Sequence, residues 1–341
     1  MHSFPHVKPG LPPAFTPQVP AGAGGFAANT RRKVVRQPAM VKPAGGGLTE
    51  MTIQSTGLLA RIWIKIAVTI AGTDAANPLG VSSVVRRLSL RANSGLELHS
   101  WSGPGYSWLL MDHLESEYYP VLLTNQGREA VSDDDFRIDM LVPVCVSLMD
   151  FTGLVLLQSK QISVTLQIDW ETDVNVCGTG TVDAVATPYV EYFTVPTLPE
   201  DRPNLGRAHL ILQDDRTVAG AGEYVYEPIV TPRYLQIIHG LNYGVAGADD
   251  VTDIRLRVEQ SNYIYDADIG LFDMEWAAFH GLARPAGVWS YDFMASSGLG
   301  NYGGARDLVN TGAITSFESV FQAGGVGDNL TTIRRMLIDV T

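Results

Sequence analysis

Apolar and polar side chains alternate with a period of two in several short stretches after residue 50. In residues 61–70, isoleucine or valine fills every second position, and residues 162–170 show the same alternation of apolar and polar types. This period is that of a β-strand with one buried face. Clusters of Gly, Asn and Asp separate the stretches, and one helix-like segment interrupts the first half of the chain. The pattern favours an antiparallel β-sandwich over alternating parallel strands and helices.

The order of elements in the first half of the chain recurs in the second half. The corresponding segments are an opening strand at 61–70 and 233–241, a second strand at 85–91 and 252–259, a helix-like stretch at 108–120 and 272–285, an aromatic strand at 136–139 and 289–292, and a closing strand at 164–169 and 335–339. The order is kept while the spacing varies, as expected when loops diverge and strands do not. Such a duplication within one chain indicates a structural role in an assembly more than a catalytic role.

We therefore predict an all-β protein of two tandem eight-stranded jelly-roll β-sandwiches, with a short helix in a long loop of each. Residues 1–49 contain eight prolines and are expected to form an extended basic arm, because proline suits neither a helix interior nor a central strand. The first jelly roll is expected at residues 50–194 and the second at residues 208–341. The proline-rich residues 195–207 are the predicted linker.

Charge is unevenly placed along the 341 residues. The charged fraction is 18% and the net charge is −12. So low a charged fraction fits either a surface that is buried against neighbours or an ordinary β-rich composition. Residues 1–49 carry six cations and no acid, which leaves −18 for the rest of the chain. We expect no sequence-specific binding of nucleic acid by the folded part, and contact between the arm and an anionic layer through Arg31, Arg32, Lys33 and Arg36.

Several motifs could carry chemistry, but each has a simpler explanation. His113 and Glu117 lie four residues apart on the helix-like segment, as two metal ligands could, yet a metal needs further ligands. Residues 298–303 match the pattern GxGxxG without a crossover helix after them. The aspartates at 133–135 are contiguous, whereas calcium ligands are usually spaced. We therefore predict no catalytic residue, no bound metal and no cofactor.

Two cysteines, Cys145 and Cys177, are too few for a disulfide framework or a zinc site, which favours a reducing compartment. Cys145 lies in an apolar run and is expected in the core. There is no run of eighteen apolar residues, and the first residues lack the apolar segment of a signal peptide. We expect neither a transmembrane helix nor secretion by that route.

Two such sandwiches in tandem behind a basic arm resemble the double-jelly-roll major capsid proteins of tailless icosahedral viruses, such as tectiviruses. The resemblance rests on the duplicated strand order and on residues 136–140, 289–293 and 166–170. It implies a structural protein, not an enzyme, that forms a homotrimer with six barrels around a threefold axis. Such pseudo-hexagonal capsomers would tile the icosahedral shell of a bacteriophage, over an internal lipid membrane that the arm contacts.

The same resemblance implies neighbouring capsomers, penton proteins and minor capsid proteins as partners. It places the chain in the capsid shell of the virion, after assembly in the host cytoplasm. An alternative interpretation is a carbohydrate-binding or carbohydrate-active double β-sandwich, in which Trp101, Tyr106 and Trp108 would stack on sugars. No carboxylate pair in a recognisable setting accompanies these aromatic residues. A β-sandwich interaction protein is a third interpretation.

Overall fold

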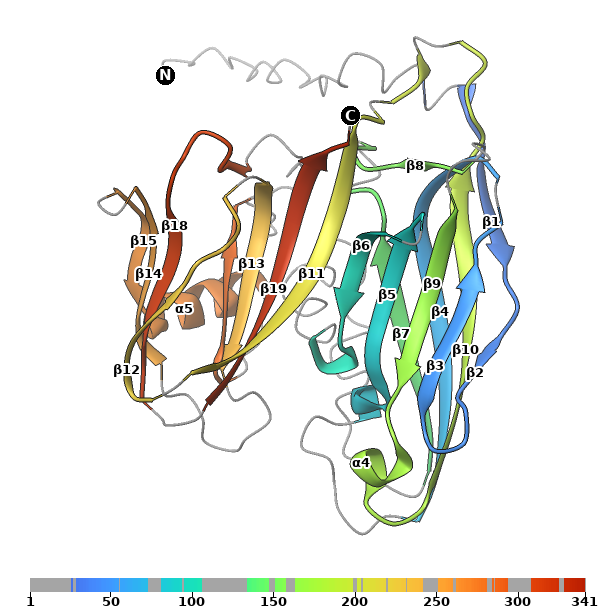
Figure 1. Ribbon diagram of the computed structural model, residues 1–341, viewed down its shortest axis with the longest axis horizontal. Helices are drawn as coiled ribbons and strands as arrows, with labels where there is room; N and C mark the ends of the chain where they lie inside the picture. The colour runs from blue at the N-terminus through green and yellow to red at the C-terminus, as the bar shows by residue number, and fades with distance from the viewer. Residues whose placement is uncertain are drawn as a thin grey trace, which may run out of the picture.

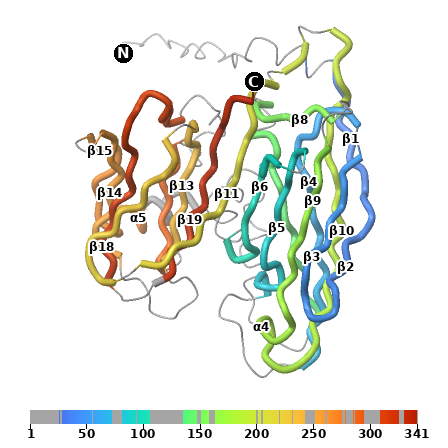
Figure 2. The backbone as a smooth tube through the Cα atoms, viewed as in Figure 1, coloured from blue at the N-terminus to red at the C-terminus, as the bar shows by residue number. Residues whose placement is uncertain are grey.

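The computed structural model of the chain consists of β-sheets with a few short helices (Figure 1). It describes residue 26 and residues 29–340, with gaps at 55, 73–80, 94, 106–133, 147–150, 158–162, 199–200, 204, 219, 231, 242–250, 260–261, 281–283, 285, 294–307 and 325–327. A long central sheet is shared by both halves of the chain, and each of the two smaller sheets packs against one half of it (Figures 1 and 2).

The first half of the chain forms a sandwich of two four-stranded layers, β1-β10-β4-β7 and β3-β9-β5-β6. Its elements are β1 (Arg32–Arg36), β2 (Met40–Val41), β3 (Gly47–Thr52), β4 (Leu58–Ala71), η1 (Val81–Val84), β5 (Val85–Ala92), β6 (Leu96–Trp101), β7 (Asp134–Pro143), β8 (Val155–Leu156), β9 (Val164–Trp170), α4 (Asp173–Cys177) and β10 (Thr181–Phe193). The short strand β2 also pairs with β10, and β8 pairs with β4.

The second half repeats this arrangement with the layers β11-β19-β13-β16 and β12-β18-β14-β15. Its elements are β11 (Arg207–Val218), β12 (Gly222–Tyr226), β13 (Arg233–Leu241), β14 (Val251–Val258), β15 (Asn262–Asp268), α5 (Ile269–His280), β16 (Val288–Asp292), β17 (Val309–Asn310), β18 (Phe317–Ala323) and β19 (Asp328–Asp339). The strands of each half can be counted in chain order, leaving out the two-residue strands β2, β8 and β17. In each half the first, eighth, third and sixth strands then form one layer, and the second, seventh, fourth and fifth form the other. This is the jelly-roll order, so the predicted fold class is confirmed.

The two jelly rolls also share a β-bulge at the same place. In β4 the bulged residue is Ala60, and the pairing with β10 resumes at Glu191. In β13 the bulged residue is Leu235, and the pairing with β19 resumes at Arg335. Because a bulge changes which residues face each other, its repetition gives an exact residue-by-residue correspondence between the halves.

The structure corrects two details of the predicted repeat. The closing strand at 164–169 is β9, whose counterpart by sheet order is β18, not the strand at 335–339. That last strand, β19, corresponds to β10. In addition, β1 and β2 lie within residues 1–49, the predicted arm. Residues 32–41 are extended there, but as sheet strands on β10, so the first jelly roll begins before residue 50.

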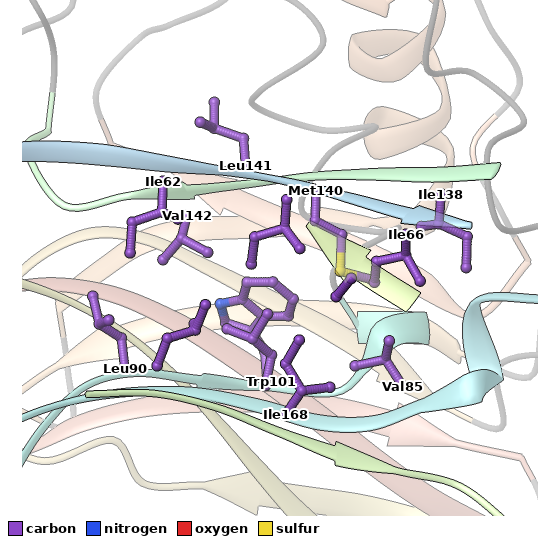
Figure 3. Close-up of a cluster of buried hydrophobic side chains, with 14 of the residues drawn as sticks. Ile62, Ile66, Val85, Leu90, Trp101, Ile138, Met140, Leu141, Val142 and Ile168 are labelled. Carbon is purple, nitrogen blue, oxygen red and sulfur yellow. The ribbon is translucent and has the colours of Figure 1, made fainter. Parts of the chain in front are cut away.

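The core of the first jelly roll fills the space between its two layers. Side chains at alternate positions of β4, such as Ile62 and Ile66, meet Ile168 of β9 and Leu90 of β5 there. The Trp101 ring inserts between the layers and is 1% exposed (Figure 3). Burial of so many apolar side chains supplies the main favourable free energy of the fold.

Candidate functional site

The predicted anionic-contact residues lie at one edge of the first jelly roll. Arg32, Lys33 and Arg36 belong to β1, and Arg31 directly precedes it. All four residues are exposed. The backbone N–H of Arg31 donates a hydrogen bond to Thr194 Oγ1 at 2.9 Å, which helps to fix the start of the strand. The structure therefore brings the four cations together on an ordered strand, and whether they meet an anionic layer stays a prediction.

One of these cations is held by the protein's own carboxylate. Glu191 of β10 is fully buried and lies between Arg32 Nε at 2.7 Å and Arg61 Nε at 2.8 Å. Trp63 Nε1 donates a further hydrogen bond to Glu191 Oε2 at 3.2 Å. Burial alone would raise the pKa of Glu191, but the hydrogen bonds from Arg61 and Arg32 outweigh it and hold that pKa below its usual value. Arg32 is thus oriented by an ion pair.

The second jelly roll contains an ion-pair cluster on the three corresponding strands, but at another position, because the counterpart of Glu191 there is Arg335. Asp339 of β19 accepts from Arg233 Nη1 at 2.8 Å and from Arg207 Nε at 3.3 Å. The hydrogen bond from Arg233 is the largest cause of a lowered pKa of Asp339. Its side chain is 52% exposed, whereas that of Glu191 is 0% exposed. A carboxylate thus joins three strands in each half, and only that of the first half is buried.

The structure assigns no chemistry to the other polar motifs. His113, Glu117 and residues 298–303 lie outside the described residues, as does Asp133. Asp135 accepts a hydrogen bond from Thr69 Oγ1 at 2.6 Å across β4 and β7. Among the described residues, no three His, Cys, Asp or Glu side chains are grouped as metal ligands would be. No helix within that part of the chain is long and apolar enough to cross a bilayer.

The two cysteines and the histidines His99 and His239 are shut away from solvent. Cys145 and Cys177 are both buried, as the sequence predicts for Cys145. His99 and His239 are fully buried, and burial lowers the pKa of each to about 3. The Nδ1 atom of His239 lies 2.9 Å from the hydroxyl of Thr332. Substrates cannot reach groups in these positions, so they act in packing.

The alternative carbohydrate interpretation loses its central residue. Trp101 is 1% exposed and packs in the core, where it cannot stack on a sugar (Figure 3). Tyr106 and Trp108 lie outside the described residues. No observation in the described part of the chain favours a sugar site.

Comparison with solved structures gives long, nearly complete matches. The major capsid protein of Sulfolobus turreted icosahedral virus matches with a TM-score of 0.66 and 13% identity, over 91% of this chain and 96% of that chain. The capsid protein of the virus PBCV-1 matches with a TM-score of 0.64 and 11% identity, over 91% and 94%. The major capsid protein of bacteriophage PM2 matches with a TM-score of 0.53 and 11% identity, over 90% and 97%.

The chain has the double-jelly-roll fold of these major capsid proteins. No protein-family model and no curated protein sequence matches the chain. At 11–13% identity the likeness covers the arrangement of the strands and not individual side chains. The double jelly roll extends over both halves and includes β1, which the repeat in the sequence did not reveal.

Proposed function

We propose that this double jelly roll is a viral major capsid protein. The observation that supports the proposal most is the match of both halves together, over 91% of this chain and 96% of a capsid protein of known structure. Each of the three similar proteins described above is a capsid component by its own description. The fold alone does not determine function, so the proposal also needs an assembly consistent with the duplicated fold.

The duplication suggests the form of that assembly. Three copies joined head to tail place six similar sandwiches around a threefold axis, and such a capsomer packs like a hexagon into flat facets. The capsomers would form the icosahedral shell of a bacteriophage, with penton and minor capsid proteins at other positions. Assembly would take place in the host cytoplasm. The central sheet supports the rigidity of such a tile, because hydrogen bonds join the two jelly rolls directly.

The test of this function is the oligomeric state of the purified full-length chain. We expect light scattering to give the mass of a trimer at micromolar concentration. Electron microscopy should then show hexagonal plates. Obligate interfaces bury about 2,000 Å² or more each, so the trimer should persist on dilution. A stable monomer that forms neither trimers nor plates would refute the capsid role, and sugar binding by that monomer would restore the alternative.

The proposed function includes no catalytic step. It is supported by the burial of the cysteines and of the histidines His99 and His239. Elemental analysis of the purified protein tests this directly. Zinc, iron or manganese at one equivalent per chain, lost on the substitution His113→Ala or Glu117→Ala, would contradict it.

We further propose that Arg31 and the basic residues of β1, which are Arg32, Lys33 and Arg36, contact the anionic surface of an internal membrane. The support is their exposure and the lack of acids in residues 1–49. Near anionic lipid, each cation contributes about 1 kcal/mol, and the contribution falls with salt. The double substitution Arg31→Glu, Arg36→Glu should abolish flotation with anionic liposomes. Arg137→Glu, an exposed site on β7, is the matched control, and equal flotation of both variants would remove the membrane from the proposal.

A further inference from the structure

The two jelly rolls of one chain are joined through a short parallel strand pair. In the pair of β6 with β11, Ile211 faces His99 and Leu212 faces Ser100. The ring centroids of His99 and His209 lie 5.8 Å apart beside this pair. Ile211 and His99 are both 0% exposed. The fifth strand of the first jelly roll and the first strand of the second are therefore buried against each other.

The counterpart of β6 in the second jelly roll is β15, and a bulge gives the register. In the first jelly roll the bulge skips Leu98, and His99 is the next paired residue of β6. In the second jelly roll the corresponding bulge skips Ile264, and Tyr265 is the next paired residue of β15. Tyr265 therefore occupies the place of His99.

The counterpart of β11 in the first jelly roll is β1. Ile211 of β11 pairs with Arg335, the residue at which pairing resumes after the bulge in β13. Val34 of β1 pairs with Glu191, the residue at which pairing resumes after the same bulge in β4. Val34 therefore occupies the place of Ile211.

Parts of these two counterpart strands are exposed, whereas Ile211 and His99 are buried; Tyr265 itself is half-buried against Phe272 and Tyr291. Val34 is 49% exposed, and Tyr263 and Ile264 of β15 are 45% and 40% exposed. Among the described residues, β1 pairs only with β10, and β15 pairs only with β14. An exposed strand edge is a template for pairing with another chain.

The hydrogen bonds of β1 leave suitable backbone groups at its outer edge. Thr194 N–H donates to the carbonyl oxygen of Arg31, and Gln37 N–H donates to the carbonyl oxygen of Pro188. In an antiparallel pair, residues alternate between facing the partner strand and facing away from it. The backbone groups of Val34, between these two points, therefore face outward and can accept a further strand.

The two edges also have opposite charge. β1 contains Arg32, Lys33 and Arg36 and no acid, while β15 contains Asp266 and Asp268 and no base. Figure 1 shows the two strands at opposite ends of the molecule, so they cannot pair within one chain. A pair between them must join two copies.

We propose that β15 of one copy pairs in parallel with β1 of the next copy and repeats the internal contact between β6 and β11. Tyr265 of one copy then faces Val34 of the next, and Asp266 faces Val35. This inference rests on the proposed capsid function and assigns the contact from which the capsomer is built. The contact is head to tail, and it closes into a ring with three copies. Lys33 lies two residues from Val35 on the same face and contacts Asp266 diagonally.

Disulfide trapping tests the register. Parallel neighbouring strands lie about 4.8 Å apart, which is within the Cα separation of a disulfide. We expect the variant Val34→Cys, Tyr265→Cys to form covalent trimers under mild oxidation on a non-reducing gel. The matched control is Val34→Cys, Asp268→Cys, in which the second cysteine is displaced by three residues, about 10 Å along the strand. Each single-cysteine variant controls for the buried native thiols.

A charge-reversal pair tests the contact without cysteine chemistry. Lys33→Glu should raise the dissociation constant of the trimer about three- to five-fold, and adding Asp266→Lys should restore it. Both residues are exposed, so the variants should fold, as circular dichroism can verify.

The outcomes separate this proposal from the capsid function. Trimers without cross-links, or with equal cross-links in the displaced control, would overturn the strand pairing and leave the capsid role intact. The same holds if Asp266→Lys fails to rescue Lys33→Glu. A chain that stays monomeric would overturn both.

Discussion

Replacing Glu191 by glutamine removes the charge that two arginines of the first jelly roll share. The substitution keeps the shape of the side chain and one carbonyl acceptor. It removes the negative charge 2.8 Å from Arg61 Nε, on a side chain that is only 8% exposed. Arg32 is less affected, because its side chain is 54% exposed and can turn into water. The perturbation is therefore the loss of the Glu191 charge beside one buried arginine.

The expected loss of stability follows from that burial. Removing one partner of a buried ion pair costs about 3–5 kcal/mol, because the remaining charge is neither hydrated nor neutralised. Since only Arg61 stays buried, we expect the lower end, about 3 kcal/mol. For a cooperative unit the size of one jelly roll, this lowers the melting temperature by about 6–12 °C. The loss should shrink in acid: the pKa of Glu191 is lowered by folding, so its contribution is present above about pH 4.3 and disappears as the pH falls through the folded pKa.

The second jelly roll provides the matched control. Asp339→Asn removes a carboxylate that joins the three corresponding strands but is 52% exposed. Surface ion pairs contribute little, so this variant should unfold close to the wild type. The assay is urea unfolding of both variants at pH 7 and at a series of pH values below about 4.3. The reasoning is refuted if Glu191→Gln loses less than about 1 kcal/mol, or if the two variants lose equal amounts.

Three further predictions concern the interior and one turn. His99→Leu should flatten the pH dependence of stability. Burial lowers the pKa of His99 to about 3, so below about pH 6.5 the unfolded chain binds a proton that the folded chain does not, and the wild type loses stability as the pH decreases. An unchanged slope in acid titrations of unfolding would count against this. Gly46→Ala should destabilise more than Gly45→Ala in thermal melts. Both residues have positive φ, but a Cβ on Gly46 would lie 2.9 Å from two backbone carbonyl oxygens, whereas Gly45 has open space; equal losses would contradict it. Trp101→Ala should cost about 3–5 kcal/mol in urea unfolding because it empties a site between the layers, and a loss near 1 kcal/mol would mean that the core closes around the gap.

Local pattern was a good guide where strands have one buried face. The alternation in residues 61–70 identified the central part of β4, and the strand at 233–241 was found at the bounds that β13 has in the structure. The same reasoning missed β1, because prolines and glycines dominate its surroundings and its burial pattern does not alternate. It also matched β9 with β19, since both contain leucine and isoleucine before an aspartate, and such local similarity does not reveal which strand lies beside which.

The candidate site shows the same division. The cluster of cations from Arg31 to Arg36 is visible in the sequence because it is contiguous. Glu191 is not, since it is one of many acids and stands in a strand whose outer face carries polar residues. Only the fold places it against Arg61, 130 residues earlier in the chain, and removes it from water.

The amino-acid sequence alone predicted two β-sandwiches with a basic segment before them. Those features depend on the period of side chains along one strand and on local charge, both of which are local properties. The tertiary structure decided which strands pair, where the bulges lie, and which edges remain exposed. Those properties arise from hydrogen bonds and burial between segments far apart in the chain, such as β6 with β11. The exposed edges of β1 and β15 are therefore a property of the tertiary structure, as is the pairing of their counterparts β11 and β6.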